Sequence, residues 1–245
     1  PAAGRPGAGR VKTAFLLLLG GYVLWTMFSA GLMRRGRDGR LDPVAALFQT
    51  PLAVLACVYA AREGLLSRAL VFPPAWLLGL ALGHALFALS VILTHGVVRD
   101  AWAHFLDLGG IARFTAGHPA VLARFVGISL TEEIIYRGAA QSLLAGLPGG
   151  PWTAVPAVAV LFALVHDHFY RNSRRESAEF LLFALTLGLL YHVTGSLAVV
   201  IVVHTVRNME SACLEYRALL ESTGDEDEAN RALELSVSGK PLETP

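Results

Sequence analysis

Long apolar runs separated by short polar stretches dominate the pattern of hydrophobic and polar positions along this chain. Most of the runs approach the roughly 20 residues that a transmembrane helix needs. Arginine-rich loops and Gly-Pro turns separate them, and no alternating strand pattern intervenes. The pattern therefore predicts an all-α, polytopic transmembrane helical bundle with about seven spans, six to eight being compatible. We expect the spans at residues 13–33, 44–61, 75–94, 125–147, 152–166, 180–193 and 197–220.

The rest of the chain divides around these spans. Residues 1–12 form a basic leader, and 13–118 comprise the N-terminal transmembrane helices together with an amphipathic interfacial helix at 95–118, where apolar residues recur at helical spacing. Residues 119–220 form a transmembrane core that carries the candidate chemistry. Residues 221–245 are acidic, and we expect a disordered tail with one or two helical turns.

Composition supports a membrane location. The 245 residues are 54% hydrophobic and 16% charged, and mean hydropathy is +0.54, whereas soluble domains carry about 25% charged residues. A net charge of +1 argues against nucleic acid as a partner. The richness in Ala, Leu, Arg and Gly favours a bacterial source, so we expect an integral protein of the bacterial inner membrane.

Three isolated residues have a structural interpretation. Cys57 and Cys213 lie in or beside apolar runs without CxxC spacing, so we expect packing residues rather than a disulfide or metal ligands. His84 lies in the middle of the third run, where a hydrogen-bonded core histidine is the favoured interpretation.

The fourth run contains charges that an apolar span should exclude, namely Glu132, Glu133 and Arg137. A charge at bilayer depth costs roughly 2.5 to 3.5 kcal/mol on insertion scales, so such residues usually face the protein interior or a water-filled cavity. Glu133 and Arg137 are four residues apart and can pair on one helix face. Glu132 points about 100° away around the helix and remains available for another role.

Two further runs carry polar residues at the same spacing. Phe162 and His166 are four residues apart in the fifth run, and His204 and Asn208 are four apart in the seventh. Each has a simpler reading alone: His166 as an interfacial residue, and His204 with Asn208 as hydrogen bonds between helices. Three such faces together would satisfy one another at the centre of a bundle, which predicts a site.

The chemistry available to this set is activation of water. A carboxylate and an imidazole can share a water molecule and take its proton as it attacks a carbonyl. A second imidazole and a carboxamide can donate hydrogen bonds to the developing oxyanion. Arg137 would hold Glu133 ionised and fix the helix geometry.

Glu132-Glu133-x-x-x-Arg137, Phe162-x-x-x-His166 and His204-x-x-x-Asn208, in this order on separate apolar segments, resemble the CPBP family. This is the family of CAAX prenyl proteases and bacteriocin-processing proteins, also called the Abi or type II CAAX endopeptidase family. The resemblance covers roughly residues 120–212. The N-terminal spans and the acidic tail add nothing diagnostic.

The resemblance implies a glutamic intramembrane endopeptidase that acts on a membrane-anchored or membrane-embedded protein within the lipid bilayer, without a metal or other cofactor. It implies that Glu132 and His166 activate the water and that His204 and Asn208 form the oxyanion hole. Glu133 and Arg137 support the site, and Phe162 completes the second motif. A prenylated CAAX tail, a C-terminal sorting tail and a bacteriocin leader all remain possible substrates.

Three alternatives stay open at this point. The first is a zinc-dependent protease, with His166, His204 and a carboxylate as ligands. The second is a non-catalytic immunity or scaffold protein of the same fold. The third is a proton-coupled transporter with a Glu and His relay, although the sequence shows no repeated halves.

Overall fold

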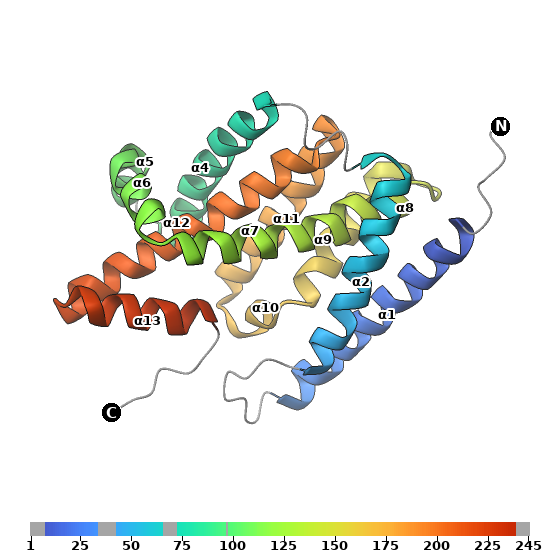
Figure 1. Ribbon diagram of the computed structural model, residues 1–245, viewed down its shortest axis with the longest axis horizontal. Helices are drawn as coiled ribbons and strands as arrows, with labels where there is room; N and C mark the ends of the chain where they lie inside the picture. The colour runs from blue at the N-terminus through green and yellow to red at the C-terminus, as the bar shows by residue number, and fades with distance from the viewer. Residues whose placement is uncertain (1–7, 34–42, 66–72, 97, 239–245) are drawn as a thin grey trace.

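The computed structural model describes residues 8–33, 43–65, 73–96 and 98–238. Within these ranges the ordered elements are helices and no strand occurs, which confirms the predicted all-α polytopic bundle (Figure 1). The helices are α1 (Ala8–Met33), α2 (Pro43–Arg62), α4 (Pro73–His95), α5 (Val98–Leu106), α6 (Leu108–Gly117), α7 (Pro119–Glu133), the π-helix η1 (Ile134–Gln141), α8 (Ser142–Leu144), α9 (Gly150–Leu164), α10 (Asp167–Arg171), α11 (Arg174–Thr194), α12 (Leu197–Thr223) and α13 (Glu226–Ser238).

Long apolar helices make up the membrane part. Among the described residues, α1, α4, α11 and α12 are each long and apolar enough to cross a membrane, and α2 and α9 are shorter apolar helices. The continuous rod of α7, η1 and α8 occupies the predicted fourth span. Large apolar side chains remain exposed on the outer faces of the bundle, as Leu17 (73%), Leu77 (68%) and Trp152 (76%) show. Such surfaces suit contact with lipid tails.

The centre of the bundle is α12, which α4, α7, α11 and α13 all contact. Every residue from Leu197 to Thr205 is buried, as expected for a helix that is apolar on all sides and enclosed by others. Figure 1 shows α7 crossing α12, with α1 and α2 side by side at one end of the molecule.

Two glycines allow α4 to approach α12 closely. A Cβ atom added at Gly79 would lie 2.7 Å from Val202 Cβ, and one added at Gly83 would lie 2.8 Å from Val206 Cβ. Gly79 and Gly83 are four residues apart, the small-residue spacing that brings transmembrane helices together. The Gly79-x-x-x-Gly83 spacing is visible in the sequence.

The amphipathic segment after α4 forms two short helices, α5 and α6, instead of the single helix that was predicted. Asp107 separates them, and its side chain caps α6 by accepting a hydrogen bond from the Gly110 backbone N–H. Arg217 of α12 donates a second hydrogen bond to the same carboxylate. The Gly110 N–H and then the Arg217 guanidinium lower the pKa of Asp107. Asp107, at the break between the two helices, thus links this segment to α12.

The acidic tail contains a helix, α13, that is longer than the one or two turns that were predicted. Gly224, with φ of 67°, ends α12, and the Asp225 side chain accepts hydrogen bonds from the next backbone N–H groups, those of Asp227 and Glu228. Acidic residues then fill the first turn of α13, where they complement the positive end of the helix. Ala229 and Leu233 are fully buried on its inner face. The run of acidic residues in the tail is therefore the N-terminal turn of a helix.

The single-residue interpretations can be compared with the structure. Both cysteines are free, Cys57 exposed and Cys213 buried. His84 is a hydrogen-bonded core histidine, as predicted, with Nδ1 2.8 Å from Glu210 and Nε2 3.0 Å from the Phe105 carbonyl. The predicted basic leader lies outside the described residues as far as residue 7, and α1 begins at Ala8.

We expect Gly79→Leu or Gly83→Leu to destabilise the protein, because the new side chain would force α4 away from α12. Overpacking of this kind costs roughly 1–3 kcal/mol. The measurement is the midpoint of thermal unfolding in detergent. Gly20→Leu is the matched control, because nothing lies within 4 Å of a Cβ atom at Gly20. Equal midpoints for Gly79→Leu and Gly20→Leu would contradict the close approach.

Candidate active site

The site is built on a buried ion pair between α7 and the π-helix that continues it. Glu133 is the last residue of α7, and Arg137 lies in η1. Both side chains are fully buried, with Arg137 Nε 3.2 Å from Glu133 Oε2 and Nη1 donating to Oε1 at 3.2 Å. Arg137 Nη2 donates to the Ala184 carbonyl of α11 at 3.0 Å. The pair therefore joins the Glu-Glu rod to α11.

The helix widens directly after Glu133. All eight residues of η1 are buried, and short π-helical segments inside α-helices often occur at functional sites. The Ser142 hydroxyl donates to the Arg137 carbonyl at 3.2 Å, which pairs a carbonyl within the widened turn. The four-residue spacing predicted the ion pair correctly, whereas the widening itself left no mark in the apolar pattern.

His204 of α12 reaches the same buried carboxylate. Its Nδ1 lies 2.8 Å from Glu133 Oε1, so this nitrogen donates the hydrogen bond. The other ring nitrogen, Nε2, faces Glu132 Oε2 at 3.8 Å. Glu133 thus fixes the orientation of His204 and leaves Nε2 directed at Glu132.

His166 lies on the other side of Glu132. It follows the end of α9, and its Nδ1 is 2.6 Å from the Phe162 carbonyl oxygen. A carbonyl only accepts, so Nδ1 carries a proton and Nε2 is the ring nitrogen directed at Glu132. That nitrogen is 3.4 Å from Glu132 Oε1. Glu132 therefore has one imidazole near each carboxylate oxygen.

Phe162 packs against both histidines and the buried arginine. It is fully buried, and its ring centroid lies 4.4 Å from that of His166 and 6.0 Å from that of His204. The Arg137 guanidinium carbon is 4.6 Å from the same centroid, a cation–π distance. One aromatic ring thus contacts both histidines and the buried arginine, which explains how Phe162 can set their relative positions.

Glu132 opens into a cavity of about 560 Å³, called here the Glu132 cavity. Its Oε2 atom is shielded from solvent and receives no hydrogen bond from the described residues, so this oxygen can accept one from a reacting molecule. The walls are formed by α1, α2, the rod of α7 and η1, and the segment after α9. The lining residues are Tyr22, Gln49, Arg124, Gly127, Ile128, Thr131, Glu132, Ile135, Tyr136, Val165 and His166.

The first two helices were not expected to take part in the site. Tyr22 of α1 and Gln49 of α2 line the Glu132 cavity, and the Gln49 amide donates to the Tyr22 hydroxyl at 2.7 Å. Buried Phe15 and Leu52 anchor the same two helices in the main core. No motif marks Tyr22 or Gln49, because their role depends on how helices distant in sequence pack.

Asn208 is less closely integrated. It lies one turn beyond His204 on α12 and is partly buried. Within the described part of the chain, no side-chain hydrogen bond connects it to Glu132, Glu133, His166 or His204. The structure therefore brings six of the seven predicted residues into one contact network and leaves Asn208 beside it.

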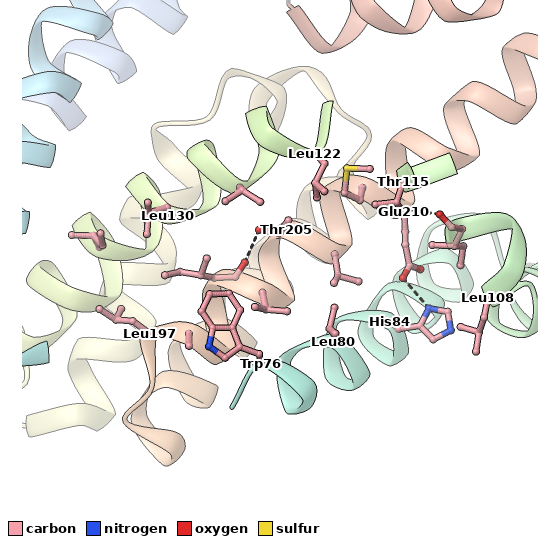
Figure 2. Close-up of a pocket in the computed structure, with 18 residues that line it drawn as sticks. Trp76, Leu80, His84, Leu108, Thr115, Leu122, Leu130, Leu197, Thr205 and Glu210 are labelled. Atoms are coloured by element: carbon pink, nitrogen blue, oxygen red, sulfur yellow. Dashed lines mark hydrogen bonds and ion pairs between the residues drawn. The ribbon is translucent and has the colours of Figure 1, made fainter. Parts of the chain in front are cut away.

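A second polar cluster and a larger cavity lie elsewhere (Figure 2). Glu210 binds His84 and also His104, whose Nε2 is 3.0 Å away. His84 and Glu210 line a cavity of about 740 Å³ between α4, α6, α7 and α12. Its walls are otherwise almost entirely apolar and include none of the seven predicted residues. The larger cavity is therefore separate from the Glu132 cavity.

Metal ligation gains no support from the geometry. Over the ranges that the structure describes, no group of three His, Cys, Asp or Glu side chains is placed so that it could hold a metal ion. In the set considered for zinc, the Nε2 atoms of His166 and His204 lie 3.4 and 3.8 Å from the Glu132 carboxylate.

Comparison with known protein families gives one match. The sequence model described as type II CAAX prenyl endopeptidase Rce1-like matches residues 115–209, which confirms the resemblance predicted from the three motifs. The matched segment contains all seven predicted site residues and excludes α1, α2, α4 and α13. No curated protein and no solved structure matched the chain.

We expect Arg137→Ala to destabilise the protein strongly, since Glu133 would remain buried with only His204 beside it. Removing one partner of a buried ion pair typically costs about 3–5 kcal/mol. Thermal unfolding in detergent measures the effect, with exposed Arg113→Ala as the control. If Arg137→Ala unfolded at the same temperature as Arg113→Ala, the structural role of the pair would be refuted.

Proposed function

We propose that this integral membrane protein is an intramembrane endopeptidase, because residues 115–209 match the Rce1-like type II CAAX prenyl endopeptidase model. It would hydrolyse a peptide bond in a membrane-anchored or membrane-embedded segment of another protein, by water activated between Glu132 and His166. A processed C-terminal tail or sorting signal is the substrate type we favour, and the bacterial inner membrane is the proposed location.

One observation carries this proposal: the two adjacent glutamates have different surroundings. Glu133 is fully buried and bound by Arg137 and His204. The Glu132 side chain is 22% exposed, faces the Glu132 cavity, and satisfies no fixed cation among the described residues. A carboxylate that the fold does not need, held between two imidazoles inside an apolar bundle, is suited to act as a general base.

The proposed reaction uses the groups around Glu132 together with Asn208, whose role comes from the resemblance to the CPBP family alone. Glu132 takes a proton from water as the water oxygen bonds to the scissile carbonyl carbon. Nε2 of His166, which lies beside Glu132, helps to hold that water. The developing oxyanion accepts hydrogen bonds from protonated His204 and from the Asn208 amide. The C–N bond then breaks as the leaving amine takes up the proton.

The scheme requires a second proton on His204. Its Nδ1–H already donates to Glu133, so Nε2 can donate to an oxyanion only when the ring is an imidazolium. In this scheme Glu133 and Arg137 position groups and do not touch the substrate.

The non-catalytic alternative assigns no role to Glu132. A scaffold of the same fold needs the Glu133–Arg137 pair for folding, but it has no need of a second partly exposed carboxylate beside two histidines. The structure thus gives the protease reading an explanation for Glu132 that the scaffold reading lacks.

We expect Glu132→Gln to lose at least about 10²-fold in cleavage rate, in line with the usual contribution of a general base, while keeping its unfolding temperature. The assay uses full-length protein in proteoliposomes and a pool of lipid-anchored peptides with randomised sequences, with products identified by mass spectrometry. Exposed Glu215→Gln is the control. Cleavage at the wild-type rate by Glu132→Gln would show that another group activates the water.

Asn208→Ala should lower kcat by roughly 10²-fold, the usual effect of removing one oxyanion donor, with little change in KM. The reason is that the amide would contact the oxygen only as negative charge develops. Steady-state kinetics on the best peptide from the pool measure both parameters. A rise in KM with unchanged kcat would instead assign Asn208 to substrate binding.

A further inference from the structure

The Glu132 cavity contains a cation that the proposed reaction does not use. Arg124 of α7 lines this cavity together with Ile128, Glu132 and Ile135. These four residues follow one another at intervals of three or four, so they lie on one face of the rod. Arg124 is eight residues before Glu132, which places the two Cα atoms about 12 Å apart along the helix axis.

The guanidinium of Arg124 has no protein partner in the residues that the structure describes, and the side chain is exposed. The buried Arg137 differs in both respects, because Glu133 and the Ala184 carbonyl occupy its donors. Arg124 is the sole lysine or arginine among the residues that line the Glu132 cavity in the part of the chain that the structure describes. This end of the cavity is therefore electropositive.

The opposite wall does not offset this charge. Tyr22 and Gln49 are neutral and bonded to each other, and Glu132 is the sole carboxylate among the described lining residues. The cavity thus has an anionic end at Glu132 and a cationic end at Arg124. A substrate with a negative group would be drawn to the Arg124 end and held away from Glu132, which would orient the chain.

We propose that Arg124 determines substrate specificity by binding a substrate carboxylate, from either an acidic side chain or a free C-terminus. An extended chain advances about 3.3–3.6 Å per residue, so about 12 Å corresponds to three or four residues from the cleaved bond. Lysine or arginine at that position would be repelled. This inference rests on the proposed peptidase function and adds the chemistry that the substrate must carry.

The test uses full-length wild type, Arg124→Gln and Arg124→Glu in phosphatidylcholine proteoliposomes, with exposed Arg113→Gln as the matched control. The probes are pools of lipid-anchored peptides that contain a randomised segment and an amidated C-terminus. Each pool has one fixed residue, Glu, Ala or Lys, placed three or four residues to either side of that segment. A further pair of pools differs only in a C-terminal carboxylate or carboxamide. Initial cleavage rates are measured by mass spectrometry.

Wild type and Arg113→Gln should cleave a carboxylate pool at least about tenfold faster than the Lys pool, a difference of about 1.4 kcal/mol. Arg124→Gln should abolish the preference, and Arg124→Glu should reverse it. Preference for Glu over Ala in the amidated pools identifies a side-chain carboxylate. Preference for the free acid over the carboxamide identifies the C-terminus.

Two results would overturn the inference while leaving the proposed function intact. One is an unchanged preference in Arg124→Glu. The other is an equal loss of rate on every pool in Arg124→Gln, which would assign Arg124 to the fold or to lipid headgroups. If no pool were cleaved by wild type in a Glu132-dependent manner, the proposed function would fail first, and the specificity role would fail with it.

Discussion

A carboxylate buried inside an apolar bundle is the constraint on which this structure depends. Glu133 is completely removed from solvent, and an unpaired charge there would be prohibitively unfavourable. Arg137 and His204 both bind it, and Arg137 also reaches the backbone of α11. Three helical elements are thus fixed around one negative charge. The same contacts set the directions in which Glu132 and His204 Nε2 point.

In the proposed mechanism, two adjacent residues take separate roles: Glu133 is structural and Glu132 is chemical. Because Glu133 satisfies the fixed cation, Glu132 can remain partly exposed beside two imidazoles without weakening the fold. Phe162 keeps those imidazoles and Arg137 in contact with one ring. The N-terminal helices, which lie outside the matched family segment, close the cavity with Tyr22 and Gln49. That wall of the cavity therefore comes from residues outside the matched segment.

Much of the arrangement could be predicted from spacing, because a four-residue interval places two side chains on one face in any regular helix. This gave the Glu133–Arg137 pair and the alignment of Phe162 with His166. The same rule could not reveal Tyr22, Gln49 or Arg124 as cavity residues, since their position depends on packing between distant helices. The π-helix was hidden because its residues are buried on all sides. In the tail, the helix over Glu226–Ser238 is longer than the one or two turns expected near residues 229–235, because acidic residues at a helix N-terminus resemble a disordered acidic segment in composition.

The central claim is that Glu132 makes this membrane protein a peptidase, and the most direct measurement is a map of protein termini in cells that carry its gene. Membrane and secreted proteins would be compared by mass spectrometry between cells with the gene intact, cells lacking it, and deletion cells that express wild type or Glu132→Gln. We predict a set of new N- and C-termini that disappears on deletion and returns only with wild type. Restoration of the same termini by Glu132→Gln would contradict the assignment and favour a scaffold or relay.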